Sequence, residues 1–196
     1  RQQSNPVFTN ITLAFNTASI AGWNEGGGGG IAIWNGGNAS ISNTVVYDNS
    51  AINYGGDNIW EATDEPADSI TITYSDVQDG WEGEGNIDAD PLFADPANDN
   101  YTLQWGSPAI DAGDPDLDGD GSDYTTDTDD QDPDGTRMDM GAYYFNQNDT
   151  IPPDLYISSL SSTNVGTEDS ITVFWEVGFD VGLDTALIEL LYTDTT

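Results

Sequence analysis

The residues best suited to chemistry lie in one acidic stretch, which begins "GDPDLDGDGSDY". Asp114, Asp116, Asp118 and Gly119 follow a D-x-D-x-D-G pattern. In such loops alternate side chains turn toward one ion, and glycine makes the sharp turn. A further acid, Asp123, stands nine positions after Asp114. Carboxylate oxygens at this spacing are ligands for a hard divalent cation, and we expect Ca²⁺.

The same pattern recurs sixteen residues later, at Asp130, Asp132, Asp134 and Gly135, with Asp139 again nine positions after the first acid. Each half could supply carboxylates for one ion, or the two halves could enclose a shared pair. Asp120, Asp127 and Asp129 offer spare carboxylates. The predicted calcium ligands are Asp114, Asp116, Asp118, Asp120, Asp123, Asp130, Asp132, Asp134 and Asp139.

Two other interpretations of the acidic stretch are open. An EF-hand would place Glu at position 12 of each loop, where this chain has Thr125 and Gly141. A solvated acidic linker is the common explanation of a charge run. The periodic spacing, and the flanking apolar pieces "SPAI" and "MGAYYF", favour a folded loop with both ends tied down. Arg137 lies inside the second loop and is expected to pair with a nearby Asp.

Composition excludes several classes of function. The chain of 196 residues carries 36 Asp and Glu against two Lys and Arg, a net charge of −34. Nucleic acids and anionic membranes are therefore not expected partners. The absence of Cys and His removes thiolate and imidazole ligands and the usual catalytic triads. So acidic a chain is expected to be extracellular or exposed on the cell surface.

The elements that must position the acidic stretch are short strands in a repeat. "VFTNITLAFNTA", "SISNTVVYDNSA" and "SITITYSDV" alternate apolar and polar residues, the period of a strand. Matching Phe8 to Ile41 gives an offset of 33, and matching Ile41 to Ile72 gives 31. Asn16 then matches Asn49, so we expect an asparagine ladder between stacked turns of the chain. The alternative fold is a β-sandwich.

The later chain divides into further parts. Residues 1–146 are predicted to form a parallel β-helix that carries the acidic loop at its C-terminal end, and 147–153 a linker containing a Pro pair. Residues 154–196 contain three predicted strands: "LYISSLSS", "SITVFWEVGF" and "TALIELLYTD". An immunoglobulin-like sandwich takes about 7 strands, so this segment is expected to be partial.

Several motifs resemble the C-terminal part of secreted bacterial right-handed parallel β-helix proteins of the pectin-lyase-like kind. The most specific are "GSPAIDAG" and "DMGAYYF", together with the repeat pattern at residues 11–18 and 42–51. The resemblance implies a secreted surface protein in which this region ends the helix and an immunoglobulin-like module follows. It implies little about activity, because such folds carry many functions.

Three functions fit these observations. The first is a calcium-stabilised structural protein, a fibre subunit or adhesive stalk, that associates head-to-tail by strand complementation. The second is a carbohydrate-binding surface module that uses Trp34 and Trp60 beside Gly-rich turns. The third is a glycosidase fragment with a carboxylate pair drawn from Asp76, Asp79, Glu82 and Glu84. We expect no catalysis, because acids are abundant enough here to cluster by chance.

Overall fold

The computed structural model describes residues 5–19, 27–33, 37–52, 56–61 and 69–148, together with the backbone of 155–160 and 173–177. Contacts divide the chain into two units, Arg1–Asn146 and Gln147–Thr196. The described elements are strands apart from two short 3-10 helices, η1 (Pro96–Asn98) and η2 (Thr128–Asp130). The described chain is therefore all-β, as the sequence predicts.

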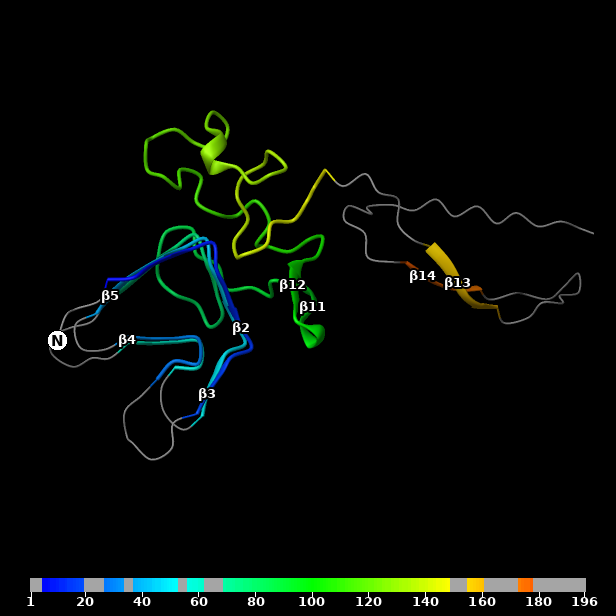
Figure 1. Ribbon diagram of the computed structural model, residues 1–196, viewed down its shortest axis with the longest axis horizontal. Coiled ribbons are helices and arrows are strands. Elements are labelled where there is room, and N and C mark those ends of the chain that lie inside the picture. Colours follow the sequence, from blue (N-terminus) through cyan, green and yellow to red (C-terminus); the bar gives the residue numbers. More distant parts are fainter. Residues whose placement is uncertain are drawn as a thin grey trace, which may run out of the picture. The chain divides into compact units, whose positions relative to one another are not determined.

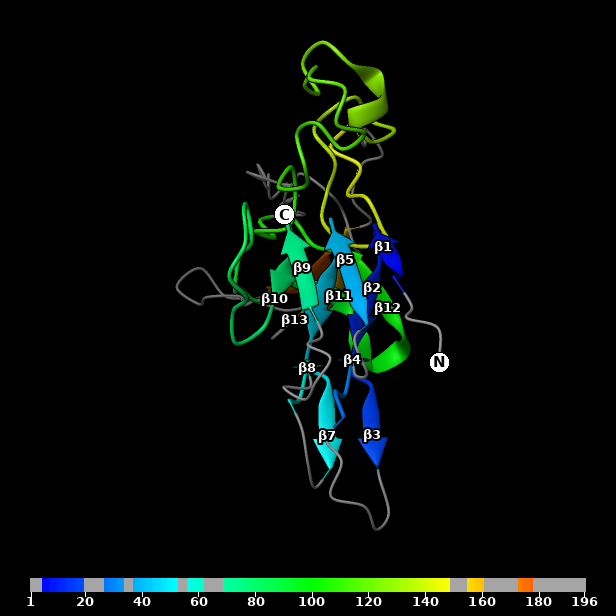
Figure 2. The same ribbon diagram turned by 90° about the vertical axis from the view of Figure 1, so that its left-hand side faces the viewer.

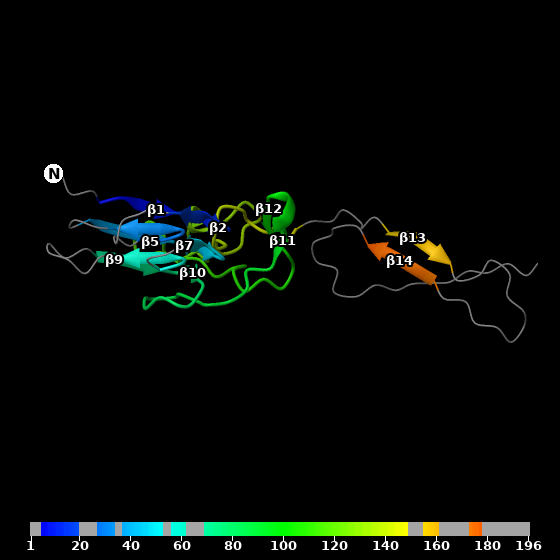
Figure 3. The same ribbon diagram turned by 90° about the horizontal axis from the view of Figure 1, so that it is seen from below.

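The first unit begins with short strands that follow one another at sharp corners (Figure 1). Their bounds are β1 Val7–Thr9, β2 Thr12–Ala14, β3 Thr17–Ser19, β4 Ile31–Ile33, β5 Asn38–Ser42, β6 Val45–Tyr47, β7 Ser50–Ile52, β8 Ile59–Glu61, β9 Ser69–Thr73 and β10 Asp76–Val77. They form parallel sheets in the orders β1-β5-β9, β2-β6-β10, β3-β7 and β4-β8. Figures 2 and 3 show β1, β5 and β9 side by side.

The register of these sheets confirms the predicted repeat. Phe8 pairs with Ile41, and Ile41 pairs with Ile72, at the offsets read from the sequence. The corners match as well, because equivalent positions adopt a left-handed backbone in each repeat. These positions are Asn10, Asn43 and Tyr74 at one corner, and Phe15, Asp48 and Asp79 at the next. Each repeat therefore follows the course of the one before it.

Alternation along the strands produces the core. In β5 and β9, residues at every second position are buried and the intervening residues are exposed or partly so. Successive side chains of a strand point to opposite faces, so Ile41, Val46, Ile72 and Val77 face one another inside the repeats. Ile31 and Ile33 of β4 close the same cluster from the opposite side.

The asparagine ladder predicted from Asn16 and Asn49 is present. Asn16 donates through Nδ2 to Asn49 Oδ1 at 2.9 Å, and Asn49 donates through Nδ2 to Asn58 Oδ1 at 3.1 Å. Asn58 in turn donates to Gln78 Oε1 at 3.2 Å. Asn10 and Asn43 differ, since both Nδ2 groups lie near Met138 Sδ. The second pair thus joins the repeats to the acidic stretch.

The strands are followed by a short hairpin. β11 (Phe93–Asp95) and β12 (Asn100–Leu103) pair in antiparallel fashion around η1. Phe93 lies within 6.3 Å, ring centroid to centroid, of Phe15 and of Tyr47 at the corners of the repeats. Tyr101 adds a fourth ring, 5.5 Å from Phe93. These aromatic contacts dock the hairpin on the stacked strands.

In the second unit, β13 (Leu155–Leu160) and β14 (Val173–Val177) form an antiparallel pair with an irregularity between Ile157 and Ser159. They fall within two of the three strands predicted there, while the third lies outside the described residues. No helix in the described part of the chain is long and apolar enough to cross a membrane.

Candidate metal centre

The acidic segment, defined as residues 113–141, is joined to the strands through Asn43. This residue is fully buried at the corner between β5 and β6. Its Oδ1 accepts a hydrogen bond from the Asp114 amide at 2.6 Å, and its carbonyl accepts one from the Gly141 amide at 2.8 Å. One side chain and its own backbone therefore hold both ends of the segment, which appears in yellow-green in Figure 1.

Within the segment, aspartates make tight turns with their own backbone. In most of them the Oδ1 atom accepts from the amide two positions ahead, which is how Asp favours turns over helix or strand. The pairs are Asp114 with Asp116, Asp118 with Asp120, Asp120 with Ser122, Asp123 with Thr125, Asp127 with Asp129, Asp132 with Asp134, and Asp134 with Thr136. Gly119 and Gly135 have φ of 74° and 88°, so glycine makes the predicted turns.

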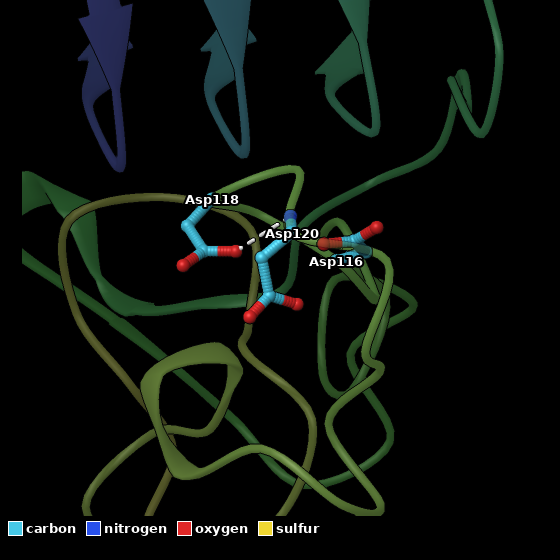
Figure 4. A group of neighbouring side chains, drawn as sticks. All are labelled: Asp116, Asp118 and Asp120. Carbon is cyan, nitrogen blue, oxygen red and sulfur yellow. Dashed lines mark hydrogen bonds between the residues drawn. The ribbon is translucent and has the colours of Figure 1, made fainter.

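Three of the predicted ligands converge. Asp116, Asp118 and Asp120 each offer a carboxylate oxygen, and these oxygens all lie within 4.8 Å of one another (Figure 4). Oxygens at 2.3–2.6 Å from one Ca²⁺ are themselves about 3–5 Å apart. Asp118 and Asp120 are exposed and Asp116 is partly buried, so the group opens to solvent on one side. Three oxygens at this spacing could contact one cation.

Asp130 is hydrogen-bonded to the backbone between two members of this group, although its carboxylate is not one of the three that converge. Its side chain is 0% exposed, and its Oδ1 accepts from the Leu117 amide at 2.6 Å, inside the first loop. Its Oδ2 is buried and has no hydrogen-bond partner, and the same holds for Asp116 Oδ1. A buried carboxylate oxygen without a partner costs several kcal/mol unless a cation or a proton neutralises it. Asp130, predicted as the start of the second loop, thus belongs with the first.

The remaining acids of the second loop lie in a different arrangement. Asp139 is 5% exposed and accepts through both oxygens, from the Asp111 amide at 2.7 Å and from the Phe145 amide at 2.6 Å. It fastens two backbone segments, which leaves less of its carboxylate for a metal. Asp132 Oδ2 is buried without a hydrogen-bond partner. Asp123 accepts from both the amide and the hydroxyl of Thr125 and so closes a turn.

The buried negative charge of the acidic segment raises the pKa of several of its aspartates. Burial is the main cause that raises the pKa of Asp132 to about 7, and the side chain and charge of Asp134 add to it. Burial likewise raises the pKa of Asp139 to about 6, against the opposing backbone hydrogen bonds. Burial also raises the pKa of Asp114, with contributions from the charges of Asp116 and Asp130. A bound cation reverses this direction, because it favours the ionised form.

Arg137 does not make the contact that its position predicts. Its guanidinium donates to the carbonyl oxygens of Gly113 at 2.5 Å and Ala112 at 3.4 Å, and lies 5.7 Å from the centre of the Tyr74 ring. It therefore supports the backbone at the start of the acidic segment, and its charge opposes the rise in the pKa of Asp114.

The other predicted sites are placed less favourably. Trp60 is partly buried in β8, where it pairs with Ala32 of β4, and Trp34 lies outside the described residues. Asp76 is 0% exposed, so within the carboxylate set predicted for a glycosidase it is shielded from solvent. Comparisons with protein families, with curated proteins and with solved structures found no match for this chain.

Proposed function

We propose that this chain is a segment of a calcium-stabilised, right-handed parallel β-helix that serves as a structural element outside the cell, in a fibre subunit or an adhesive stalk. The proposal joins the resemblance of its motifs, the parallel sheets and the chemistry of the acidic segment. Each of these supports a different part of it.

The parallel sheets support the β-helix. Strands of successive repeats pair in register at constant offsets, and their corners adopt matching conformations. Stacked turns of this kind distribute stability between neighbouring repeats and suit an extended scaffold. Parallel crossovers are right-handed in about 98% of cases, which supplies the handedness. The acidic segment is held at Asn43 and lies along one row of corners, where Met138 contacts Asn10 and Asn43 and Arg137 lies over Tyr74.

The single observation that carries calcium binding is the buried carboxylate of Asp130. Its Oδ1 accepts from the Leu117 amide, between Asp116 and Asp118, and its Oδ2 is buried without a hydrogen-bond partner. All the donors are oxygens, and the chain contains neither His nor Cys, so a hard cation fits better than zinc or copper. The ion would bridge the two predicted half-loops, and its contribution would be to stability instead of chemistry.

Strand edges support self-association. β1 is an outer strand of its described sheet, and Val7 on it is 73% exposed. An exposed edge is a template for another chain, and head-to-tail pairing of such edges produces filaments. We therefore propose that copies of the chain stack end to end. Negative-stain electron microscopy in Ca²⁺ should show ordered filaments, whereas a monomeric sedimentation profile at all concentrations would contradict this part.

Thermal unfolding tests the calcium site. At about 100 times its dissociation constant, one bound ion adds about 2.7 kcal/mol to the free energy of unfolding. The melting temperature should therefore fall clearly in excess EDTA and recover with Ca²⁺. Asp118→Asn removes one ligand of the group and should abolish most of this difference. Asp99→Asn, which removes an exposed carboxylate in the η1 turn, is the matched control. Identical melting curves in Ca²⁺ and EDTA would overturn the proposal.

A further inference from the structure

The two methionines of the chain are close in sequence but differ in their surroundings. Met140 is 1% exposed, whereas Met138 is partly exposed. Met138 also lines a cavity of about 170 Å³, together with Asn10 and the half-exposed Tyr144. The chain contains no Cys, so these two side chains hold its only sulfur atoms. A small reagent that enters the cavity therefore reaches Met138, while Met140 is shielded.

Two asparagine side chains direct their amide groups at the sulfur of Met138. Asn10 donates through Nδ2 to Met138 Sδ at 3.7 Å, and Asn43 donates through Nδ2 to the same atom at 4.0 Å. The two asparagines occupy equivalent corners of successive repeats. Asn43 is 0% exposed, so its amide is shielded from water. Because a thioether sulfur is a weak acceptor, both donors are poorly satisfied by it.

Met138 lies where the acidic segment is attached to the repeats. Its carbonyl oxygen accepts from the Gly113 amide at 2.8 Å, and the next amide, that of Asp114, donates to Asn43. A Cβ atom on Gly113 would lie 2.6 Å from that carbonyl oxygen and 3.1 Å from Asn43 Nδ2, so the two backbones approach closely here. The strength of the contacts around Met138 therefore affects how firmly the segment is held.

We propose that Met138 is a site of oxidation by hydrogen peroxide or a small organic hydroperoxide, and that its sulfoxide fastens the acidic segment to the repeats. The O–O bond of the peroxide breaks, the sulfur gives up two electrons and gains one oxygen, and the other oxygen leaves as water or an alcohol. Asp132 and Asp139 line the same cavity, and the net charge is −34, so an uncharged peroxide enters more readily than an anionic oxidant.

The distances around the sulfur suit the oxidised side chain. An oxygen on the sulfur extends toward the asparagines by one bond, so nitrogens that lie 3.7 and 4.0 Å from sulfur come within the usual reach of an oxygen acceptor, about 2.7–3.2 Å. The adjoining cavity leaves room for that oxygen. Methionine sulfoxide ordinarily disrupts a packed site, because it adds a polar group without partners. At Met138 the partners are already in place.

Mass spectrometry after limited treatment of the full chain with hydrogen peroxide tests the site. Fragment ions should locate the added oxygen on Met138 several times faster than on Met140, which is the internal control because it is 1% exposed. The difference should disappear when the chain is unfolded in guanidinium chloride before the treatment. Equal rates at the two methionines of the folded chain, or faster oxidation of Met140, would overturn the proposal.

Hydrogen exchange in EDTA, where no bound ion contributes, tests the fastening. The amides of Asp114 and Gly141, which bond to Asn43, should exchange several times more slowly after oxidation. Methionine sulfoxide reductases with dithiothreitol should restore the original rates. Met138→Leu keeps the side chain apolar and of similar size, and peroxide should leave its exchange unchanged. Unchanged or faster exchange in the oxidised wild type, or equal slowing in Met138→Leu, would refute the fastening.

Discussion

The stacked strands and the acidic segment of the first unit are built on opposite principles. In the strands, buried Ile and Val side chains face one another and backbone groups pair between repeats. In the acidic segment, aspartate side chains bond to nearby amides, and the buried groups include Asp130 and Asp139. The strands exclude water with apolar side chains, whereas the acidic segment buries carboxylates that bond to backbone amides instead of water.

Because of this difference, the stability of the two regions should depend on different solution conditions. Apolar burial is insensitive to pH and to divalent ions, because neither changes the solvation of a methyl group. Buried carboxylates respond to both, since a proton or a cation determines whether their charge is tolerated. The apolar core of the strands should therefore depend little on pH or divalent ions, although Asp76 on β10, whose pKa burial raises to about 6, is an exception. The acidic segment should depend on both.

The largest effect should come from the core of the strands. Ile72 is 1% exposed, and Ile72→Ala should lower the free energy of unfolding by about 2–5 kcal/mol, because it removes packed methyl groups and leaves a cavity. Chemical denaturation should give the same loss in Ca²⁺ and in EDTA. Ile52, which is 48% exposed in β7, provides the control, and Ile52→Ala should cost far less. Equal losses for the two variants would refute the packing described for the strands.

A smaller effect is expected where the two regions meet. Asn43→Gly preserves the left-handed backbone but removes the acceptor for the Asp114 amide, so it should cost about 1–3 kcal/mol. Hydrogen exchange should show faster exchange across the acidic segment and little change in the strands. Asn10→Gly is the matched control, because Asn10 has the same conformation one repeat earlier but is exposed. Uniform destabilisation of both regions would argue against a boundary at Asn43.

The smallest expected effect is a pH dependence that changes with calcium. Asp132 and Asp139 have pKa values raised to about 7 and about 6 in the fold, above the ordinary value of 3.8. In EDTA the folded chain binds more protons, so stability should rise as the pH falls from 7 toward 4, by on the order of 1 kcal/mol per pH unit.

In Ca²⁺ the gain on acidification should shrink or reverse, because protons also compete with the ion for the carboxylates of Asp116, Asp118 and Asp120. Thermal melts at several pH values in each buffer measure the two slopes. Parallel slopes in Ca²⁺ and EDTA would show that protons and calcium act on different groups.

The sequence predicts the strands better than the acidic segment, for a physical reason. Period-2 alternation and matching offsets are local patterns, and they place Phe8 over Ile41 and Ile41 over Ile72 as observed. The turns at Gly119 and Gly135 are equally local and are confirmed. Contacts between residues that are far apart in the sequence leave no such local pattern. Asp130 bonds to the first loop because of the way the chain folds back toward Asn43. The spacing of the acids in the sequence does not reveal that path.

The same limit applies to Asp76. The sequence groups it with Asp79, Glu82 and Glu84 but does not show that it is buried. Its burial comes from Ala89 and its neighbours, which fold back over β10. The alternating pattern predicts which face of the strand Asp76 occupies. Whether that face is shielded from water depends on the residues that fold over it, and the pattern does not predict those.

The meeting of both ends of the acidic segment at Asn43 has a practical consequence for engineering. Asp114 and Gly141 are 27 positions apart in sequence, yet both bond to one residue. The segment is therefore a loop whose two ends are held together. Doubling the length of such a loop costs only about 0.6 kcal/mol in loop entropy. Thr125 and Thr126, which are both exposed and lie outside the Asp116, Asp118 and Asp120 group, are a natural point to insert a peptide or a small domain. The stacked strands would keep their register, and the inserted domain would project from the corners of the repeats.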